Sequence, residues 1–117
     1  MAAAINQNIQ LAVGEDRVIT FTVVDSAGVA VNIASSTQTW RVSAHEHSAT
    51  NVLEKTGALV GGGTGGQFSV TIADTDTDAL NPGVYYHEAK VTAGSGAETV
   101  VAWGTVDLRP ARVANPV

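Results

Sequence analysis

Hydrophobic and polar residues alternate along most of this chain with a period of two, which is the pattern of β-strands with one buried face. In residues 17–24, for example, Ile19, Phe21 and Val23 fall on one face and threonines fall on the other. No stretch repeats its hydrophobic residues every 3.6 positions, so we expect no amphipathic helix. The segments with a strand pattern are residues 9–11, 17–24, 29–33, 37–44, 51–56, 67–72, 84–92 and 98–108.

Residues that favour turns separate these predicted strands at short intervals. Asp25–Gly28 has Asp first and Gly last, as in a β-turn, and Asn81–Gly83 predicts a second turn. Residues 74–80 begin with Asp, which accepts free backbone N–H groups, and predict a single helical turn. The glycine-rich segment Gly61–Gly66 is predicted to be a flexible loop, because it lacks the Lys-Ser/Thr pair of a phosphate-binding loop.

The last two predicted strands form a hairpin, in which we place Ser95-Gly96 as a two-residue turn. This register puts His87 opposite Gly104, which leaves space for the imidazole ring. The pairs that face the core are then Tyr85–Val106, His87–Gly104, Ala89–Ala102 and Val91–Val100. The pairs that face outward are Tyr86–Thr105, Glu88–Trp103 and Lys90–Val101. A shift by one residue would invert every assignment.

Seven or eight short strands with this pattern predict an all-β fold, an immunoglobulin-like antiparallel sandwich of two sheets. Trp40 lies in the middle of a strand, where immunoglobulin-like domains bury a tryptophan. Tyr85 follows the Asn81–Gly83 turn, as the tyrosine does whose hydroxyl bonds back to the upstream backbone at the corner of such domains. His87 then occupies the position at which immunoglobulins place a cysteine.

A length of 117 residues suits one domain. We predict a sandwich at residues 9–108, an extended N-terminal arm at residues 1–8 and an extended C-terminal arm at residues 109–117. Cysteine is absent, which excludes disulfides, thiolate metal sites and thiol nucleophiles. Six Lys and Arg against eleven Asp and Glu give a net charge of −5, which argues against binding to nucleic acid or an anionic membrane. The start lacks the pattern of a signal peptide, and no stretch predicts a membrane span.

Several segments together resemble a known family. They are Phe21–Gly28, Trp40–Val42, Gly66–Ile72, Leu80–Glu88 and Trp103–Leu108. In combination they resemble the immunoglobulin-like domain at the N-terminus of tailed-bacteriophage upper baseplate proteins, and similar small phage structural proteins that stand alone. The resemblance covers roughly residues 17 to 109. It implies a domain that fastens a component to the virion.

The long fibre or receptor-binding segment that follows this domain in a baseplate protein is not present in the chain. The resemblance therefore favours a free-standing, non-enzymatic virion accessory protein, and a capsid decoration (cement) protein above others. Such a protein would dock on the major capsid protein or other virion subunits, and we expect copies to associate as a homo-oligomer. Its location would be the virion, assembled in the bacterial host cytoplasm. A tail or baseplate adaptor is the alternative from the same resemblance.

Two clusters invite a metal-binding hypothesis. His45 and His47 share one face of an extended segment, but a zinc site needs a third ligand, and His87 is placed in the core. Asp74, Asp76 and Asp78 resemble the start of a calcium loop. The Gly and Glu that such a loop needs at its sixth and twelfth positions are Ala79 and Tyr85 here, so helix capping is the simpler interpretation. We assign no catalytic, cofactor-binding or metal-binding residue, and we expect no enzyme activity.

The candidate interface lies on the outer face of the last hairpin. Trp103 is its central residue, with Tyr86 and Val101 beside it, because large apolar groups on an outer face often mark a binding surface. Arg109 and Arg112 in the C-terminal arm are candidates to pair with acidic groups of a partner. Alternatively, Trp103 packs under the Gly61–Gly66 loop or an arm. Trp103 with Tyr86 also fits a sugar-binding platform, so a carbohydrate-binding module is a further alternative.

Overall fold

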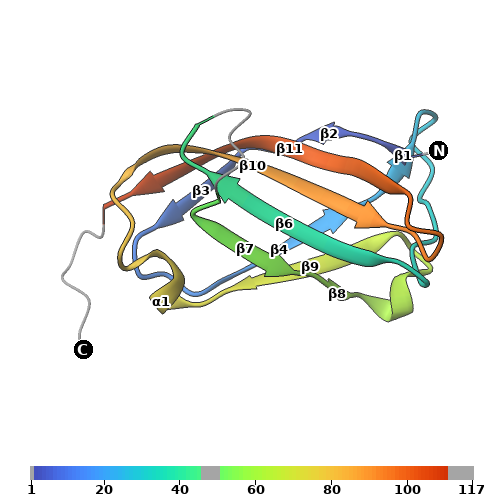
Figure 1. The fold of residues 1–117 in the computed structure, drawn as a ribbon, viewed down its shortest axis with the longest axis horizontal. Coiled ribbons are helices and arrows are strands. Elements are labelled where there is room, and N and C mark those ends of the chain that lie inside the picture. Colours follow the sequence, from blue (N-terminus) through green and yellow to red (C-terminus); the bar gives the residue numbers. More distant parts are fainter. Residues whose placement is uncertain (1, 46–50, 111–117) are drawn as a thin grey trace.

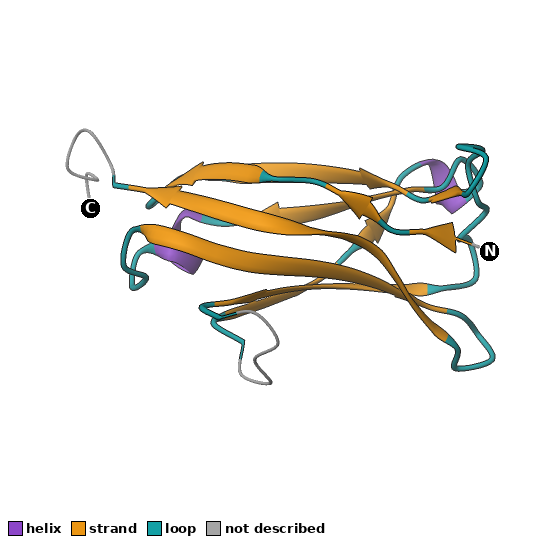
Figure 2. Ribbon diagram, turned by 90° about the horizontal axis from the view of Figure 1, so that it is seen from above, coloured by secondary structure: helices purple, strands orange, loops and turns teal. Residues whose placement is uncertain are grey.

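The chain folds as an immunoglobulin-like β-sandwich, as the alternating pattern predicts. The computed structural model describes residues 2–45 and 51–110. Viewed from above, the strands lie in two layers with loops at both ends (Figure 2). Among the described residues, no helix has the length and hydrophobicity needed to cross a bilayer.

The larger layer is a six-stranded sheet in which β10 is central. β10 pairs antiparallel with β11 on one side and with β6 on the other, and β7 pairs antiparallel with the outer edge of β6 (Figure 1). Two short N-terminal strands, β2 and β3, run parallel to β11 along its other edge. The strands are β2 (Ile5–Asn6), β3 (Ile9–Ala12), β6 (Thr37–Ser43), β7 (Leu53–Thr56), β10 (Gly83–Thr92) and β11 (Glu98–Arg109).

The smaller layer is a three-stranded antiparallel sheet with β9 in its centre. A separate two-stranded pairing joins β1 to β5. The strands are β1 (Ala2–Ala3), β4 (Arg17–Thr22), β5 (Val24–Asp25), β8 (Ala58–Leu59) and β9 (Gln67–Ile72). A 3-10 turn, η1 (Gly61–Gly63), precedes β9, and one turn of helix, α1 (Asp74–Thr77), follows it, as predicted.

The inward positions of both sheets form one hydrophobic core. In β9, Phe68, Val70 and Ile72 are buried, whereas Ser69 and Thr71 between them are not, so the predicted faces are confirmed. The rings of Phe21 in β4 and Phe68 in β9 stack with centroids 5.2 Å apart. Trp40 lies in β6 and is fully buried, as predicted. A core of this kind is the main source of stability in a small domain without disulfides.

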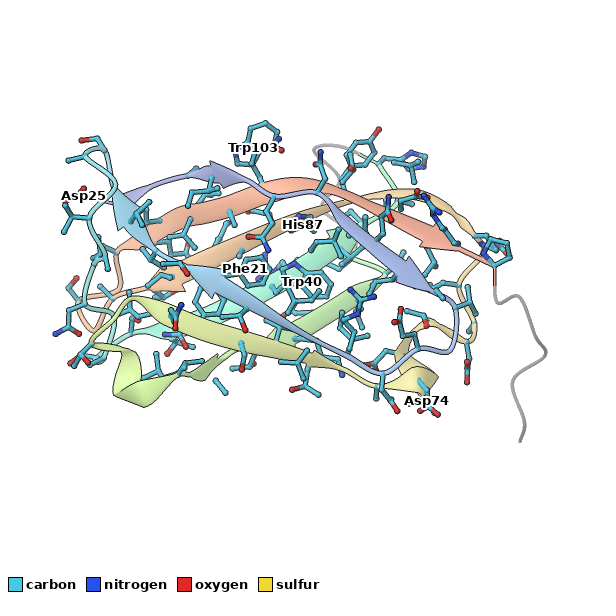
Figure 3. The ribbon with its side chains drawn as sticks, turned by 180° about the vertical axis from the view of Figure 1, so that it is seen from behind. Phe21, Asp25, Trp40, Asp74, His87 and Trp103 are labelled. Atoms are coloured by element: carbon cyan, nitrogen blue, oxygen red, sulfur yellow. The ribbon has the colours of Figure 1, made fainter. Side chains whose placement is uncertain are left out.

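The corner before β10 is confirmed in detail. The Tyr85 hydroxyl donates a hydrogen bond of 2.6 Å to the backbone carbonyl of Asn81, four residues upstream. Because this bond ties the turn to the start of β10, it fixes where the strand enters the sheet. Two residues later, His87 points into the core between the layers (Figure 3).

The β10–β11 hairpin confirms most of the predicted register and corrects the rest. Tyr85 pairs with Val106, His87 with Gly104, and Ala89 with Ala102. Beyond Ala89 the register shifts by one residue, so Lys90 pairs with Val100, and Val101 forms a β-bulge. The predicted pairs Lys90–Val101 and Val91–Val100 are therefore wrong.

The loop of this hairpin is the reason for the shift. Ala93 pairs with Ala97, and the Gly96 N–H donates to the Ala93 carbonyl at 2.8 Å, so the loop holds Gly94, Ser95 and Gly96 rather than two residues. Gly96 has a φ of +93°, which favours glycine. The longer loop moves the register by one residue, and the bulge restores it. Both Val101 and Ala102 are thereby buried.

Two predicted segments differ from the structure. The expected N-terminal arm, residues 1–8, is not free where it is described: residues 2–3 form β1 and residues 5–6 form β2. The expected return strand at residues 29–33 is reduced to an isolated bridge between Val24 and Ala30. It does not extend because the Ile33 N–H donates to the carbonyl of Gly63 in η1 instead. Of the expected C-terminal arm, Arg109 ends β11, and residues 111–117 lie outside the described residues.

Candidate functional site

An open hollow of about 540 Å³ lies on the outer face of the six-stranded sheet. This volume is within the range of sites that hold small molecules or peptide segments, about 300–1,000 Å³. Side chains of β10, β11 and β6 form most of its surface, and residues at the N-terminal edge add one wall. It is lined by Asn6, Asn8, Arg41, Ser43, His45, Asn51, Tyr86, His87, Glu88, Lys90, Trp103, Gly104 and Thr105.

Trp103 is the largest exposed side chain in this hollow. It pairs with Glu88 in β10, points away from the core and is 48% exposed (Figure 3). The predicted outward orientation is therefore correct. The alternative in which Trp103 packs under the Gly61–Gly66 loop does not hold, because Gly63 and Gly66 of that loop lie beside Ala34, Val23 and Val31. The N-terminal segment pairs with the backbone of Trp103 but leaves its side chain about half exposed. Half-buried Tyr86 also lines the hollow, from the adjacent strand.

The charged side chains at the hollow are already paired. Lys90 lies 3.5 Å from Glu88 on the same strand, and Arg41 lies 3.3 Å from Glu54 on β7. Because these pairs are largely exposed, each contributes little to stability and can exchange partners with a ligand. The hollow therefore combines one exposed indole with polar groups and with side chains of both charges.

Below this face, His87 forms a buried relay of hydrogen bonds. Its Nδ1 accepts a hydrogen bond of 3.0 Å from the Trp40 indole N–H, so the ring proton lies on Nε2, which donates to the carbonyl of Gln7. The ring is 4% exposed and lies near Phe21, with centroids 6.1 Å apart. Burial lowers the pKa of His87 below its ordinary value of 6.5, although the bond to Gln7 acts in the opposite direction. The imidazole is therefore neutral at pH 7.

The five candidate interface residues do not form one surface. Tyr86 and Trp103 both line the hollow. Val101 is 1% exposed, so its assignment to the interface is wrong, because the bulge turns it into the core. Arg109 is exposed at the far end of β11 and pairs with Asp107 at 3.2 Å, away from the hollow. Arg112 lies outside the described residues.

The start of α1 is capped by the carboxylates of Asp76 and Asp16, whereas Asp74, the predicted capping residue, contributes its N–H to the bond with Asp16. The Asp76 carboxylate accepts the Ala73 N–H at 2.7 Å and lies 2.8 Å from Lys55. The bond to Lys55 lowers the pKa of the Asp76 carboxyl below its ordinary 3.8. The Asp74 N–H donates to Asp16 at 2.6 Å. Asp78 follows as the C-terminal cap position of the same turn.

The histidine cluster is only partly described. His45 is exposed just after β6 and lines the hollow, whereas His47 lies outside the described residues. His87 is engaged in the core with Trp40 and Gln7. Within residues 2–45 and 51–110, no three His, Asp or Glu side chains are grouped closely enough to hold a metal ion.

Most polar residues that line the hollow are not among the predicted site residues. Arg41 and Ser43 alternate with the buried Trp40 and Val42, so the predicted strand already implied that they face outward. No such signal exists for Asn6 and Asn8, because they reach the hollow through parallel pairing with the last strand.

Comparison with known proteins gives a resemblance of fold only. No family model and no curated protein matches the chain. Among solved structures, CopC from Methylosinus trichosporium OB3b is similar, with 13% identity, a TM-score of 0.49, and coverage of 92% of this chain and 89% of CopC. A PKD domain from human KIAA0319 is similar with 12% identity, a TM-score of 0.43, and coverage of 97% and 84%. Identities this low carry no information on ligands.

Proposed function

We propose that the protein is a non-enzymatic structural protein of a tailed-phage virion, and specifically a capsid decoration protein. It docks on the major capsid protein or a neighbouring virion subunit through the outer face of the six-stranded sheet. The sequence resemblance described above supports the phage assignment. The observation that carries the docking face is Trp103, which is 48% exposed on a concave surface with polar groups around it.

Docking of this kind stabilises a particle passively. A tryptophan buried at the centre of an interface is a frequent hot spot, and the polar groups around it complete hydrogen bonds and exclude water. Each copy that binds the assembled capsid and not the free subunits shifts the equilibrium away from disassembly. Copies arranged around a symmetry axis of the capsid add further contacts.

The test is binding of the purified protein to capsids that lack it. We expect the wild-type protein to bind and to raise the temperature at which the capsids disrupt. Trp103→Ala weakens binding by about 30-fold or more, the loss expected for a hot spot worth about 2 kcal/mol. Val18→Ala is the matched control, since Val18 is 59% exposed in β4 on the opposite sheet. Absence of binding by the wild-type protein would reject the proposal.

Location on the particle separates the head from the tail. If electron micrographs of particles carrying labelled protein place the label on the tail or baseplate, the protein is an adaptor there. Label on the head supports decoration.

A carbohydrate-binding module is the second candidate, and the hollow favours it. Sugars stack their apolar faces on exposed aromatic rings, and their hydroxyl groups bond to planar polar side chains such as those of Asn6, Asn8 and Asn51. Reproducible hits on a glycan array, lost in Trp103→Ala and kept in Val18→Ala, together with no capsid binding, would replace the first proposal with this one.

A further inference from the structure

The N-terminal edge of the six-stranded sheet is interrupted beside the hollow. β2 pairs with Ala102 and Trp103, and β3 resumes the pairing at Val106. Gln7 and Asn8 span the interval between them. The Gln7 N–H donates to the carbonyl of Trp103 at 2.7 Å, and the Asn8 side-chain carbonyl accepts the Thr105 N–H at 3.1 Å. The segment is therefore tied to β11 on both sides of Gly104.

From inside the sandwich, His87 holds the same segment. The carbonyl of Gln7 accepts the Nε2–H of His87, and the opposite ring nitrogen accepts the N–H of Trp40. Because Trp40 is fully buried and rigidly packed, it fixes the plane of the imidazole and so the point at which Gln7 is held. The described residues contain no buried side-chain nitrogen or oxygen without a partner, so this relay is complete.

Gly104 makes the close approach possible. A Cβ atom at this position would lie 2.5 Å from the Gln7 carbonyl oxygen and 2.8 Å from the Asn8 side-chain oxygen. The predicted reason for a glycine here was space for the imidazole ring of His87. In the structure, the atoms nearest to the absent side chain belong to Gln7 and Asn8. A larger residue at position 104 would push the N-terminal segment off the sheet.

We propose that His87 is a positioning residue for the hollow: by holding Gln7 it sets Asn6 and Asn8 in place as one wall. Residues 5–8 are then a built part of the binding surface and not an arm. This proposal depends on the proposed function in one respect: it takes the hollow to be the binding site. The hydrogen bonds and the glycine constraint stand without it.

Hydrogen exchange of backbone amides tests the proposal without any ligand. The amides of Gln7 and Thr105 are the reporters, because each bonds across the contact between the N-terminal segment and β11. Gln7 donates to Trp103, and Thr105 donates to Asn8. In His87→Leu, which removes the donor to Gln7, we expect both amides to exchange about tenfold faster relative to the amides of β9. In His87→Gln, an amide side chain replaces both hydrogen-bonding nitrogens, and protection is expected to return.

A second pair of variants leaves His87 unchanged. Gly104→Ala should release the same two amides, because the new methyl group meets the Gln7 carbonyl. Gly94→Ala is the matched control, since Gly94 lies in the loop of the same hairpin and its nearest neighbour is 3.7 Å away. If His87→Leu does not fold, His87→Asn decides the outcome, because its amide is one methylene shorter than that of His87→Gln and should not span both Trp40 and Gln7. Gly104→Ala tests separately whether the segment needs the close approach to β11. Unchanged relative protection of Gln7 and Thr105 in the folded variants would overturn the proposal.

Binding distinguishes this proposal from the proposed function. If a folded His87 variant releases the amides and also weakens capsid or glycan binding, both proposals stand. If the amides are released and no capsid or glycan binds the wild-type protein, His87 still positions the segment and the proposed function fails. If the amides are released while binding persists at wild-type strength, the hollow wall is not used and the positioning role for binding is wrong.

Discussion

The two tryptophans of this protein lie on opposite faces of the same sheet. Trp40 in β6 points inward, is fully buried and donates its indole N–H to His87. Trp103 in β11 points outward, is 48% exposed and borders the hollow. Trp40 therefore has a structural role, because its ring and its N–H are both packed within the domain. Trp103 instead leaves about half of its side chain free to contact a ligand or partner. Three measurements of stability test this contrast.

The largest difference is expected between the tryptophans themselves. Trp40→Ala removes a fully buried ring and the N–H partner of His87, so we expect it to lower the free energy of unfolding by about 3–5 kcal/mol. Trp103→Ala should lower it by less than about 1 kcal/mol. Urea denaturation of both variants measures these losses. A loss of several kcal/mol on Trp103→Ala would mean that Trp103 is part of the core and would remove the contrast.

A second pair of residues applies the same comparison to the β-bulge. Val101→Ala is expected to cost about 1–3 kcal/mol, since the bulge buries Val101 to 1% exposure. Val84→Ala, at a 57% exposed position of β10, should change stability by no more than about 0.5 kcal/mol. Thermal unfolding of the two variants side by side measures the difference. Equal losses of stability in the two variants would show that Val101 faces outward, as it would in a β10–β11 hairpin without the bulge.

The smallest effect is a dependence of stability on pH. Because the pKa of His87 is lowered below 6.5 in the folded state, the unfolded chain binds a proton first as the pH falls below 6.5. Stability is then full above this value and decreases at lower pH, by at most about 1.4 kcal/mol per pH unit, until the folded pKa is reached.

The control for this measurement is His87→Gln, which should lose the decrease that begins below pH 6.5. Glu15 and Asp76 do not confuse the result, because their ordinary pKa values of 4.5 and 3.8 are lowered further and act at more acid pH. Denaturation midpoints across this range provide the data. An unchanged decrease in His87→Gln would assign it to a group other than His87.

Local patterns in the sequence were enough to predict the layers and their faces. An alternating pattern is decided by each residue and its near neighbours, so β9, the Tyr85 corner and the outward Trp103 were all predictable. The error at Val101 arose where two local rules compete. A two-residue turn is the commonest hairpin connection, but at Ser95-Gly96 it would require a positive φ at Ser95. The three-residue loop places the positive φ at Gly96, and the bulge that follows buries a further valine.

The wall of the hollow formed by Asn6 and Asn8 was not predictable from the sequence, and the reason differs from that at Val101. Asn6 and Asn8 reach the site because β2 and β3 pair in parallel with β11. No pattern in the neighbouring sequence predicts this pairing. The relay from Trp40 through His87 to Gln7 likewise joins three distant parts of the chain. Contacts of this kind are set by the packing of the whole domain.

The parallel pairing of β2 and β3 with β11 also has a consequence for synthesis on the ribosome. Translation produces β2 and β3 well before β11, their pairing strand, which is the last described strand. Ile9 and Leu11 therefore cannot complete their burial until β11 has left the exit tunnel. We expect closure of the sandwich to be a late event, and the nascent chain to present apolar surface to chaperones until then.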